Sequence, residues 1–348
     1  MKTVGYAAHS SEAHMVPYHF ERRALRGNDV AIEILYSGVC HSDLHTVNGD
    51  WGPQPYPLVP GHEIVGVVQS IGSDVKNYKV GDRVAVGCMV DSCQECDQCH
   101  AGEEQFCRNG MTPTYGAPDR ISGETTQGGY SKHIVVREEF VLSIPEGMDL
   151  SKSAPILCAG ITTYSPLRNW GVKEGSRVGV IGLGGLGHMA VKLAVAMGAE
   201  VTAISRTDKK AAEAKEIGAK GLLASSDESA MAAAASSFDL IIDTIPTKHN
   251  VDQYTPLLAV NGSLVIVGQV GEMDSFSSFP LLFGRRSVAG SLIGGIAETQ
   301  EVLNFCAEKN VYPECEIIKV DQINDAFERM AKGDLAHRIV IDMASLEA

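Results

Sequence analysis

Arg177-Val178-Gly179-Val180-Ile181-Gly182-Leu183-Gly184-Gly185-Leu186-Gly187 joins an apolar run to a turn with four glycines. The apolar run predicts a buried strand, and the apolar spacing from His188 to Met197 predicts a helix that ends at Gly198. A second strand is expected at Glu200–Ile204. In this context a G-x-G-x-x-G turn indicates a dinucleotide-binding crossover, because glycines let the backbone approach a pyrophosphate at a positive helix N-terminus. A glycine-rich turn without a ligand is the alternative.

The segments that follow continue the same alternation. Strands are expected at 239–244, 263–268 and 287–292, separated by helical segments. This alternation predicts a doubly wound parallel α/β sheet over residues 153–295. Helices are expected near 297–308 and 321–332, and a last strand at 337–342. We expect this tail, residues 296–348, to return to the first domain.

The end of the second strand indicates which nucleotide binds. NAD sites place Asp or Glu there for the ribose hydroxyls, whereas this chain has Ser205 and Arg206, followed by Lys209 and Lys210. A carboxylate would repel a 2′-phosphate, and a hydroxyl with a guanidinium can bind one. The sequence therefore favours NADP, although these cations could instead form a solvated helix start.

The N-terminal half has a different pattern of apolar and turn residues. Short β-rich runs at 30–36, 64–71 and 84–90 are separated by glycine, proline and Gly-Asp turns. They predict an irregular, mostly-β domain over residues 1–152. A chain of 348 residues is long enough for two such domains.

The hexapeptide Cys40-His41-Ser42-Asp43-Leu44-His45 carries a thiolate, a hydroxyl, a carboxylate and two imidazoles. Thiolate and imidazole are ligands that zinc prefers, and His62 and Cys158 are further candidates. Two cysteines and one histidine leave one tetrahedral position open for water or a substrate oxygen, which is typical of a catalytic zinc. Taken alone, each histidine of the hexapeptide could be a surface residue.

A polar segment, about 91–110, contains Cys93-x2-Cys96-x2-Cys99-x7-Cys107. Four thiolates at short spacing fill the tetrahedral shell of a metal and predict a structural zinc lobe. A redox-active cysteine cluster is the alternative. Cys88, Cys306 and Cys315 are expected to pack as small apolar side chains.

Composition excludes several functional classes. The net charge of −14 argues against binding to a phosphate backbone. No run approaches the about 20 apolar residues of a membrane span, and the N-terminus has no signal-peptide pattern. Nine cysteines fit a cytoplasmic metal-binding protein better than a disulfide framework.

With these motifs the chain resembles the zinc-dependent medium-chain dehydrogenase/reductases over essentially its whole length. It is most similar to the cinnamyl-alcohol-dehydrogenase branch and its bacterial NADP-dependent broad-range aldehyde reductases. The markers of this branch are Gly128-Gly129-Tyr130, the stretches 159–167 and 290–295, and Ser205. The stretch 111–116 departs from the plant cinnamyl enzymes, which carry a tryptophan in their pocket there.

The resemblance implies a Rossmann sheet inserted in a GroES-like catalytic domain, and two zinc ions per chain. Cys40, His62 and Cys158 would bind the catalytic zinc, and Cys93, Cys96, Cys99 and Cys107 the structural zinc. Ser42 would bond the substrate oxygen, His45 would end the proton relay, and Asp43 and Glu63 would support the ligands. Trp51 and Tyr115 would line the substrate pocket, although Trp51 could also be a core aromatic.

The resemblance also implies the nucleotide contacts. His41 and Arg338 would contact the pyrophosphate. The glycine turn would contribute Gly182, Gly184, Gly185, Leu186 and Gly187, and the end of the following strand would contribute Ser205, Arg206 and Lys210. The residues on the nicotinamide side would be Thr162, Ser291 and Ile293. A strand position alone would also explain Thr162, and a surface charge would explain Arg338.

The implied reaction interconverts aromatic and aliphatic aldehydes with primary alcohols by hydride transfer from NADPH. The implied partners are a small-molecule substrate and a second copy of the chain, docked through residues near 275–295, with neither nucleic acid nor membrane. Two alternatives stay open. One is an NAD-linked polyol or secondary-alcohol dehydrogenase, and the other is a non-enzymatic zinc module that binds protein or nucleic acid.

Overall fold

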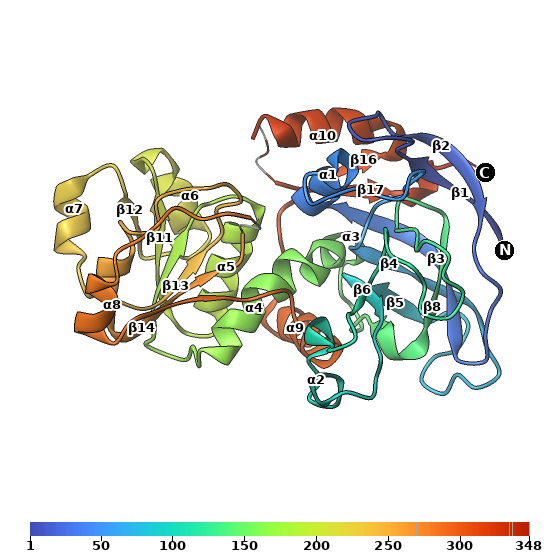
Figure 1. Cartoon of the computed structure of the whole chain (residues 1–348), viewed down its shortest axis with the longest axis horizontal. Helices are drawn as coiled ribbons and strands as arrows, with labels where there is room; N and C mark the ends of the chain where they lie inside the picture. The colour runs from blue at the N-terminus through green and yellow to red at the C-terminus, as the bar shows by residue number, and fades with distance from the viewer. Residues whose placement is uncertain (269–270, 334, 336, 348) are drawn as a thin grey trace. The chain divides into compact units, whose positions relative to one another are not determined.

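The computed structural model describes residues 1–268, 271–333, 335 and 337–347. The chain forms two compact units (Figure 1). Unit 1 comprises Met1–Cys158 and Gly294–Ala348, and unit 2 comprises Ala159–Ile293. Within the described ranges, every helix is too short or too polar to cross a lipid bilayer.

Unit 2 contains a six-stranded sheet in the order β12-β11-β10-β13-β14-β15, in which every neighbouring pair is parallel. This order confirms the predicted doubly wound sheet, since the chain extends to both sides of β10. The strands are β10 (Arg177–Ile181), β11 (Glu200–Ser205), β12 (Gly221–Ala224), β13 (Phe238–Asp243), β14 (Leu258–Ile266) and β15 (Ser287–Gly290).

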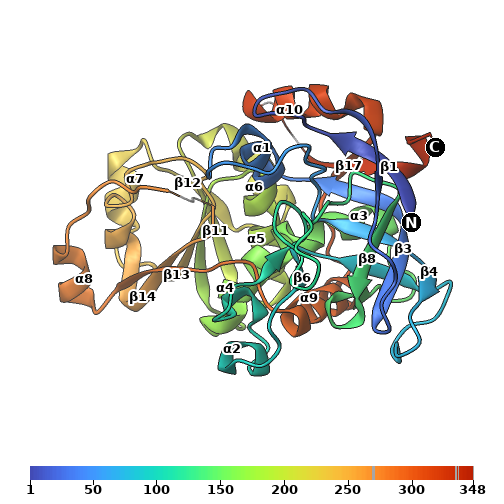
Figure 2. The ribbon, with the colours of Figure 1, turned by 45° about the vertical axis from the view of Figure 1, so that its right-hand side comes forward.

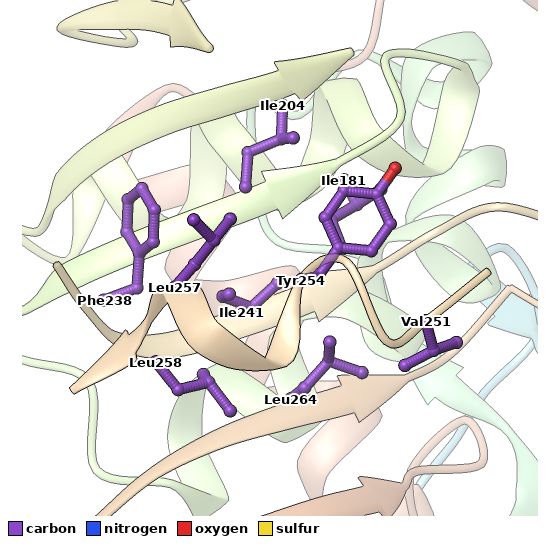
Figure 3. Packing of buried hydrophobic residues seen from close by; sticks show 9 residues of the cluster. All are labelled: Ile181, Ile204, Phe238, Ile241, Val251, Tyr254, Leu257, Leu258 and Leu264. Atoms are coloured by element: carbon purple, nitrogen blue, oxygen red, sulfur yellow. The ribbon is translucent and has the colours of Figure 1, made fainter. Parts of the chain in front are cut away.

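Helices pack on this sheet. Helix α5 lies on β10 and β11, α6 and α7 lie on β12, and α8 lies on β14. The helices of unit 2 are α4 (Ala159–Asn169), α5 (Gly185–Ala196), α6 (Ala211–Glu216), α7 (Glu228–Ala233) and α8 (Phe279–Gly284), with 3-10 turns at Asp208–Lys210 and Thr255–Leu257. Buried residues of β10, β11, β13 and β14 form a core with Val251, Tyr254 and Leu257 (Figure 3). Strand β12 was not predicted, because its four residues are only partly buried and contain no β-branched side chain.

Unit 1 is built on a seven-stranded sheet in the order β16-β17-β3-β4-β5-β9, with β8 also paired to β3. Only β16 and β17 pair in parallel; the other pairs are antiparallel. The strands are β3 (Asp29–Val39), β4 (Ile64–Ile71), β5 (Arg83–Val86), β8 (His133–Arg137), β9 (Leu142–Ser143), β16 (Cys315–Lys319) and β17 (Arg338–Asp342). Both chain ends lie in this unit (Figure 2).

Two small sheets and several short helices complete unit 1. The small sheets are β1 (Lys2–Ala7) with β2 (Val16–Glu21), and β6 (Met89–Asp91) with β7 (Thr112–Pro113). The helices are α1 (His41–Asn48), α2 (Asp97–His100), α3 (Leu150–Ser153), α9 (Ile296–Lys309) and α10 (Ile323–Ala331), with 3-10 turns at Glu104–Phe106, Glu138–Phe140, Ala154–Leu157, Val320–Gln322 and Met343–Ser345.

The strand expected at 84–90 is wrong as a single element. Its first half is β5 of the large sheet, and its second half is β6 of a small sheet. The chain leaves the large sheet at Gly87, whose carbonyl accepts a hydrogen bond of 2.5 Å from the Thr114 hydroxyl. This break directs the following residues into the cysteine-rich lobe.

Candidate active site

The hexapeptide predicted to carry chemistry begins where the central strand of unit 1 ends. Strand β3 stops at Val39, and Cys40 is the N-cap of helix α1. Asp43 closes a capping box, since its Oδ2 accepts the Cys40 N–H at 3.0 Å. Cys40 is therefore fixed by the helix start, with a side chain that is 5% exposed.

Four residues from three distant parts of the sequence meet at this helix start. One ligand atom each from Cys40, His62, Glu63 and Cys158 lies within 4.8 Å of the others, and all four residues are buried. The sulfurs of Cys40 and Cys158 are 3.8 Å apart. Zinc–sulfur bonds of about 2.3 Å in a tetrahedron place two sulfurs about 3.8 Å apart, so these residues fit zinc.

The electrostatics of the cluster also favour a cation. The hydrogen bond with Cys158 lowers the pKa of Cys40, and His62 lowers it further against the opposing effect of burial. A thiolate buried in this way needs a positive partner, since an isolated buried charge is strongly unfavourable. The donor set of two sulfurs and one imidazole provides a site for such a cation.

Asp43 orients His62 from behind. Its Oδ1 accepts from His62 Nδ1 at 2.9 Å and from the Gly61 N–H at 3.1 Å. Its Oδ2 accepts the Tyr130 hydroxyl at 2.9 Å. Because Nδ1 carries the proton toward Asp43, His62 Nε2 is the atom left to bind a metal. Sequence reasoning gave Tyr130 no role, since its contact with Asp43 depends on the folded sheet.

Glu63 and Arg338 form a buried pair beside the cluster. The Arg338 guanidinium donates to Glu63 Oε1, while Glu63 Oε2 and Arg338 Nε have no partner among the described residues. Burial lowers the pKa of Arg338, but Glu63 and Cys40 raise it by more. A side chain at Gly38 would collide with Glu63 Oε2, so this glycine makes room for the carboxylate.

A row of polar and aromatic side chains follows along helix α1. Ser42 Oγ lies 3.6 Å from the Cys40 sulfur. His45 Nδ1 lies 2.7 Å from Asp50 Oδ2, and its ring centre lies 5.3 Å from Trp51. The turn at Gly49 (φ 76°) returns the chain so that the Asp50 N–H bonds the His45 carbonyl. Sequence reasoning missed Asp50, although its position after a glycine C-cap was a signal that it could face His45.

Three other predicted residues of unit 1 lie near these groups. Burial lowers the pKa of His41, whose ring centre is 6.2 Å from that of His45. Tyr115 is buried, with its ring centre 6.0 Å from that of His62, and burial raises its pKa. Trp51 is 44% exposed, which excludes the alternative of a core aromatic.

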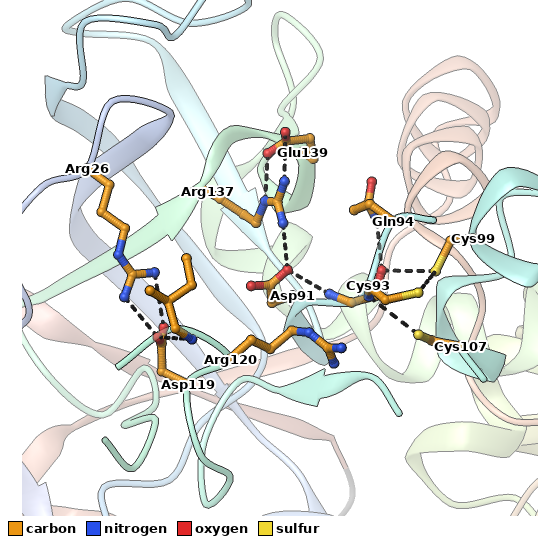
Figure 4. Close-up of polar contacts among 12 residues, drawn as sticks. Arg26, Asp91, Cys93, Gln94, Cys99, Cys107, Asp119, Arg120, Arg137 and Glu139 are labelled. Carbon is orange, nitrogen blue, oxygen red and sulfur yellow. Dashed lines mark hydrogen bonds and ion pairs between the residues drawn. The ribbon is translucent and has the colours of Figure 1, made fainter. Parts of the chain in front are cut away.

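The four-cysteine lobe forms a second candidate metal site, of which Figure 4 labels Cys93, Cys99 and Cys107. Cys93 and Cys99 sulfurs are 3.8 Å apart, and Cys96 and Cys99 sulfurs are 3.6 Å apart, as zinc requires. Backbone N–H groups point at the sulfurs: that of Cys93 reaches Cys107, and that of Arg108 reaches Cys96, each at 3.4 Å.

Backbone N–H groups also prepare the lobe for a cation. The N–H of Glu95 contributes most to lowering the pKa of Cys93 to about 6. At the base of the lobe, Asp91 accepts from the Ser92 N–H and from Arg137, each at 2.8 Å (Figure 4). The lobe is therefore fixed to strand β8 independently of the catalytic cluster.

Unit 2 contains the glycine turn. Gly182 has φ 88°, and a side chain there would lie 2.8 Å from Thr244 Oγ1. A side chain at Gly187 would collide with the Gly182 carbonyl. The turn therefore needs these glycines, and helix α5 begins directly at Gly185.

The predicted nucleotide-selecting residues lie at the end of β11. Ser205 is its last residue, Arg206 is exposed, and Lys210 donates to the Leu183 carbonyl of the glycine turn at 2.6 Å. Elsewhere in unit 2, Thr162 is buried in α4, Ser291 follows β15, and Ile293 has a positive φ of 38°. A β-branched residue in that conformation is strained, which is typical of functional positions.

The chain is similar to known proteins in sequence and in fold. Residues 26–146 match the family described as alcohol dehydrogenase GroES-like domain, and residues 185–308 match zinc-binding dehydrogenase. The chain is 52% identical to NADP-dependent alcohol dehydrogenase C 1 of Mycolicibacterium smegmatis, over all of both chains. Among solved structures, a cinnamyl alcohol dehydrogenase from Sorghum bicolor has a TM-score of 0.95 and 40% identity, covering 100% of this chain and 99% of that one. The Helicobacter pylori cinnamyl alcohol dehydrogenase complexed with NADP(H) has a TM-score of 0.91 and 42% identity, with the same coverage.

Proposed function

The chain belongs to the cinnamyl-alcohol-dehydrogenase branch of the zinc-dependent medium-chain dehydrogenase/reductases, and on this premise we propose that it interconverts aldehydes and primary alcohols with NADPH and NADP. It is a zinc-dependent alcohol and aldehyde oxidoreductase. The observation that carries the finer proposal is the meeting of Cys40, His62 and Cys158 in one buried cluster. With Glu63 paired to Arg338, these three ligands would leave one tetrahedral position for a substrate oxygen. The name of the Mycolicibacterium relative supports NADP.

We assign a separate task to each unit. Unit 1 would hold both zinc ions and the substrate, and unit 2 would bind NADP(H) through its parallel sheet and glycine turn. In unit 1, Cys40, His62 and Cys158 would bind the catalytic zinc and the four lobe cysteines the structural zinc. Zinc at the catalytic site supplies a Lewis acid for a carbonyl oxygen, and NADPH supplies the hydride.

The chain's own residues would move the proton. The Ser42 hydroxyl lies beside Cys40 and would bond the substrate oxygen. His45 would exchange that proton with solvent, since it lies on the same helix and is only partly buried. The Asp50 carboxylate accepts from Nδ1 of His45 and would thereby leave Nε2 to take up or release the proton.

The remaining assignments concern binding. Asp43 and Glu63 would hold the metal ligands in place, as their contacts with His62 and Arg338 indicate. Nucleotide binding would use the glycine turn, with Ser205, Arg206 and Lys210 at the 2′-phosphate. His41 and Arg338 would contact the pyrophosphate, and Thr162, Ser291 and Ile293 the nicotinamide. Trp51 and Tyr115 would line the substrate pocket.

A survey of initial rates tests this function. Aromatic and aliphatic aldehydes would each be reduced with NADPH, and turnover of both classes is the expected result. Absence of NADPH oxidation with every aldehyde, in protein that contains zinc, would contradict the proposed function.

Asp50→Asn is expected to lower kcat for aldehyde reduction about tenfold at neutral pH, because His45 loses the carboxylate that orients it. KM for NADPH and zinc content should be unchanged. A double-mutant cycle with His45→Gln provides the control. If Asp50 acts through His45, the double variant is no slower than His45→Gln alone; additive losses would contradict this role.

We propose that two copies associate through unit 2. The exposed apolar side chains Phe276, Phe279, Leu282, Phe283 and Leu292 lie in the expected segment 275–295, and β15 is the edge strand of the parallel sheet. Light scattering should give a dimer mass for the natural chain and a monomer mass for Leu282→Glu with Phe283→Glu. Val80→Glu, at an exposed apolar residue of unit 1, should stay dimeric.

We also propose a cytoplasmic location. The seven cysteines assigned to zinc are free of disulfide bonds, and reducing surroundings such as the cytosol would keep them so.

A further inference from the structure

A buried acidic residue ends the strand next to the glycine turn. Asp243 is the last residue of β13 and pairs in register with Ile181, the last residue of β10. In the sheet order these two strands lie where the chain direction across the sheet reverses, and open α/β sheets bind ligands beside that point. Asp243 is completely buried there.

The charged partner of Asp243 among the described residues is His249. Asp243 Oδ2 lies 2.9 Å from His249 Nε2, and Asp243 Oδ1 accepts the Ile245 N–H at 3.1 Å. The other ring nitrogen, His249 Nδ1, lies 2.8 Å from the Thr247 carbonyl. A carboxylate and a carbonyl only accept hydrogen bonds, so both ring nitrogens must carry hydrogen. The geometry therefore requires the charged imidazolium.

The neighbouring charges agree with this protonation state. The Asp243 hydrogen bond raises the pKa of His249, burial opposes it, and Asp274 also favours the charged form. Lys248, the adjacent cation, is paired with Asp274 at 2.9 Å. The ring centre of Tyr254, an aromatic neighbour, lies 6.3 Å from that of His249.

The ion pair of Asp243 and His249 closes a short loop, residues 244–250, which lies against the glycine turn. Thr244 Oγ1 donates to the Ile181 carbonyl at 2.7 Å, and a side chain at Gly182 would lie 2.8 Å from Thr244 Oγ1. Beyond the loop, Val251 and Tyr254 are buried in the core of unit 2 (Figure 3). Between Thr244 and Val251, the side chain of His249 bonds to Asp243 and so links the loop to β13.

We propose that His249 is a positioning residue for nucleotide binding, which holds the loop 244–250 beside the glycine turn through its ion pair with Asp243. The proposal rests on the NADP(H) site proposed above. Loss of the imidazolium would leave Asp243 buried without its charged partner, and the loop would relax. Affinity for NADP(H) should then fall without a change in the proton relay.

The sign of the pH dependence follows from linkage. An unpaired histidine has a pKa of about 6.5, and the pair raises it in the folded chain. The stabilisation is therefore complete below about pH 6.5 and is lost as pH rises through the higher folded value. Binding of NADPH should weaken on the alkaline side of neutrality.

NADPH fluorescence titration of the zinc-containing chain from pH 7 to 9 tests the proposal. This range lies above the ionisation of a phosphate near about pH 6. We expect the Kd of the natural chain to rise severalfold across the range. His249→Leu should have a Kd about tenfold higher at pH 7 and no such rise, and kcat at saturating NADPH should be nearly unchanged.

Two further variants complete the experiment. His249→Gln, whose amide can still donate to Asp243, should show a smaller loss and no pH dependence, and it replaces the leucine variant if that one does not fold. His14→Gln, an exposed histidine of unit 1, should match the natural chain. If a variant without His249 kept the natural Kd and pH dependence, the role of His249 would be overturned and the proposed function would stand. Absence of NADPH binding by the natural chain would overturn the proposed function itself.

Discussion

Cys40→Ala is expected to lower kcat/KM for aldehyde reduction about a thousandfold and to halve the zinc content from two ions to one. The variant loses a thiolate from a site with two sulfurs and one imidazole, and the remaining His62 and Cys158 hold zinc weakly. A Lewis acid supplies several kcal/mol of charge stabilisation, and each 1.4 kcal/mol corresponds to about tenfold in rate. The fold should persist, because helix α1 keeps the Asp43 hydrogen bond to the backbone N–H of residue 40.

Cys99→Ala is the contrasting variant for this prediction. It also removes one zinc, but from the lobe, where metal binding contributes folding energy. We expect its melting temperature to fall by about 5 °C or more, while the rate per folded chain is largely kept. Cys315→Ala, at a half-buried thiol outside both clusters, should keep both zinc ions. Metal analysis and calorimetry distinguish the three variants. Full activity in Cys40→Ala would show that the zinc bound by Cys40, His62 and Cys158 is not the electrophile.

Ser205→Asp combined with Arg206→Ala is expected to shift the preference from NADPH toward NADH by a few hundredfold in the ratio of kcat/KM values. Arg206 is exposed at the end of β11, where it can bind a 2′-phosphate through charge-assisted hydrogen bonds, each contributing about 1.5–3 kcal/mol. The new carboxylate would repel that phosphate and would bond the ribose hydroxyls of NADH.

Initial rates with both nucleotides measure this shift. Lys220→Ala provides a matched loss of one positive charge in unit 2, because Lys220 is exposed and paired with Glu200 at 2.7 Å. It should leave the ratio unchanged. Unchanged discrimination in the double variant would refute the interpretation of the strand end. A natural chain that prefers NADH would instead favour the alternative of an NAD-linked polyol or secondary-alcohol dehydrogenase.

The parallel sheet could be predicted from the sequence because its signals are local. The strand, glycine turn and helix of 177–197 occur in one continuous segment, and strands β11, β13 and β14 after it have buried cores. Strand β12 lacked such a core. The run 84–90 gave no sign that the chain passes from one sheet to another at Gly87. Both depend on pairing partners elsewhere in the chain.

The same distinction applies to the site. Candidate metal ligands could be proposed from residue type, since thiolates and imidazoles are uncommon and their spacing is informative. Asp50 was missed although it directly follows a glycine C-cap, which was a usable signal. Tyr130 and His249 could not be proposed, because their hydrogen bonds to Asp43 and Asp243 are formed only in the fold. A phenol or an imidazole in a β-rich or polar segment has no distinctive pattern by itself.

Anomalous diffraction at the zinc edge, from crystals of the natural chain, would locate the metal ions. We expect two zinc peaks per chain, one of them at bonding distances of about 2.0–2.3 Å from Cys40 Sγ, His62 Nε2 and Cys158 Sγ. A single peak, located among the four lobe cysteines, would contradict this expectation.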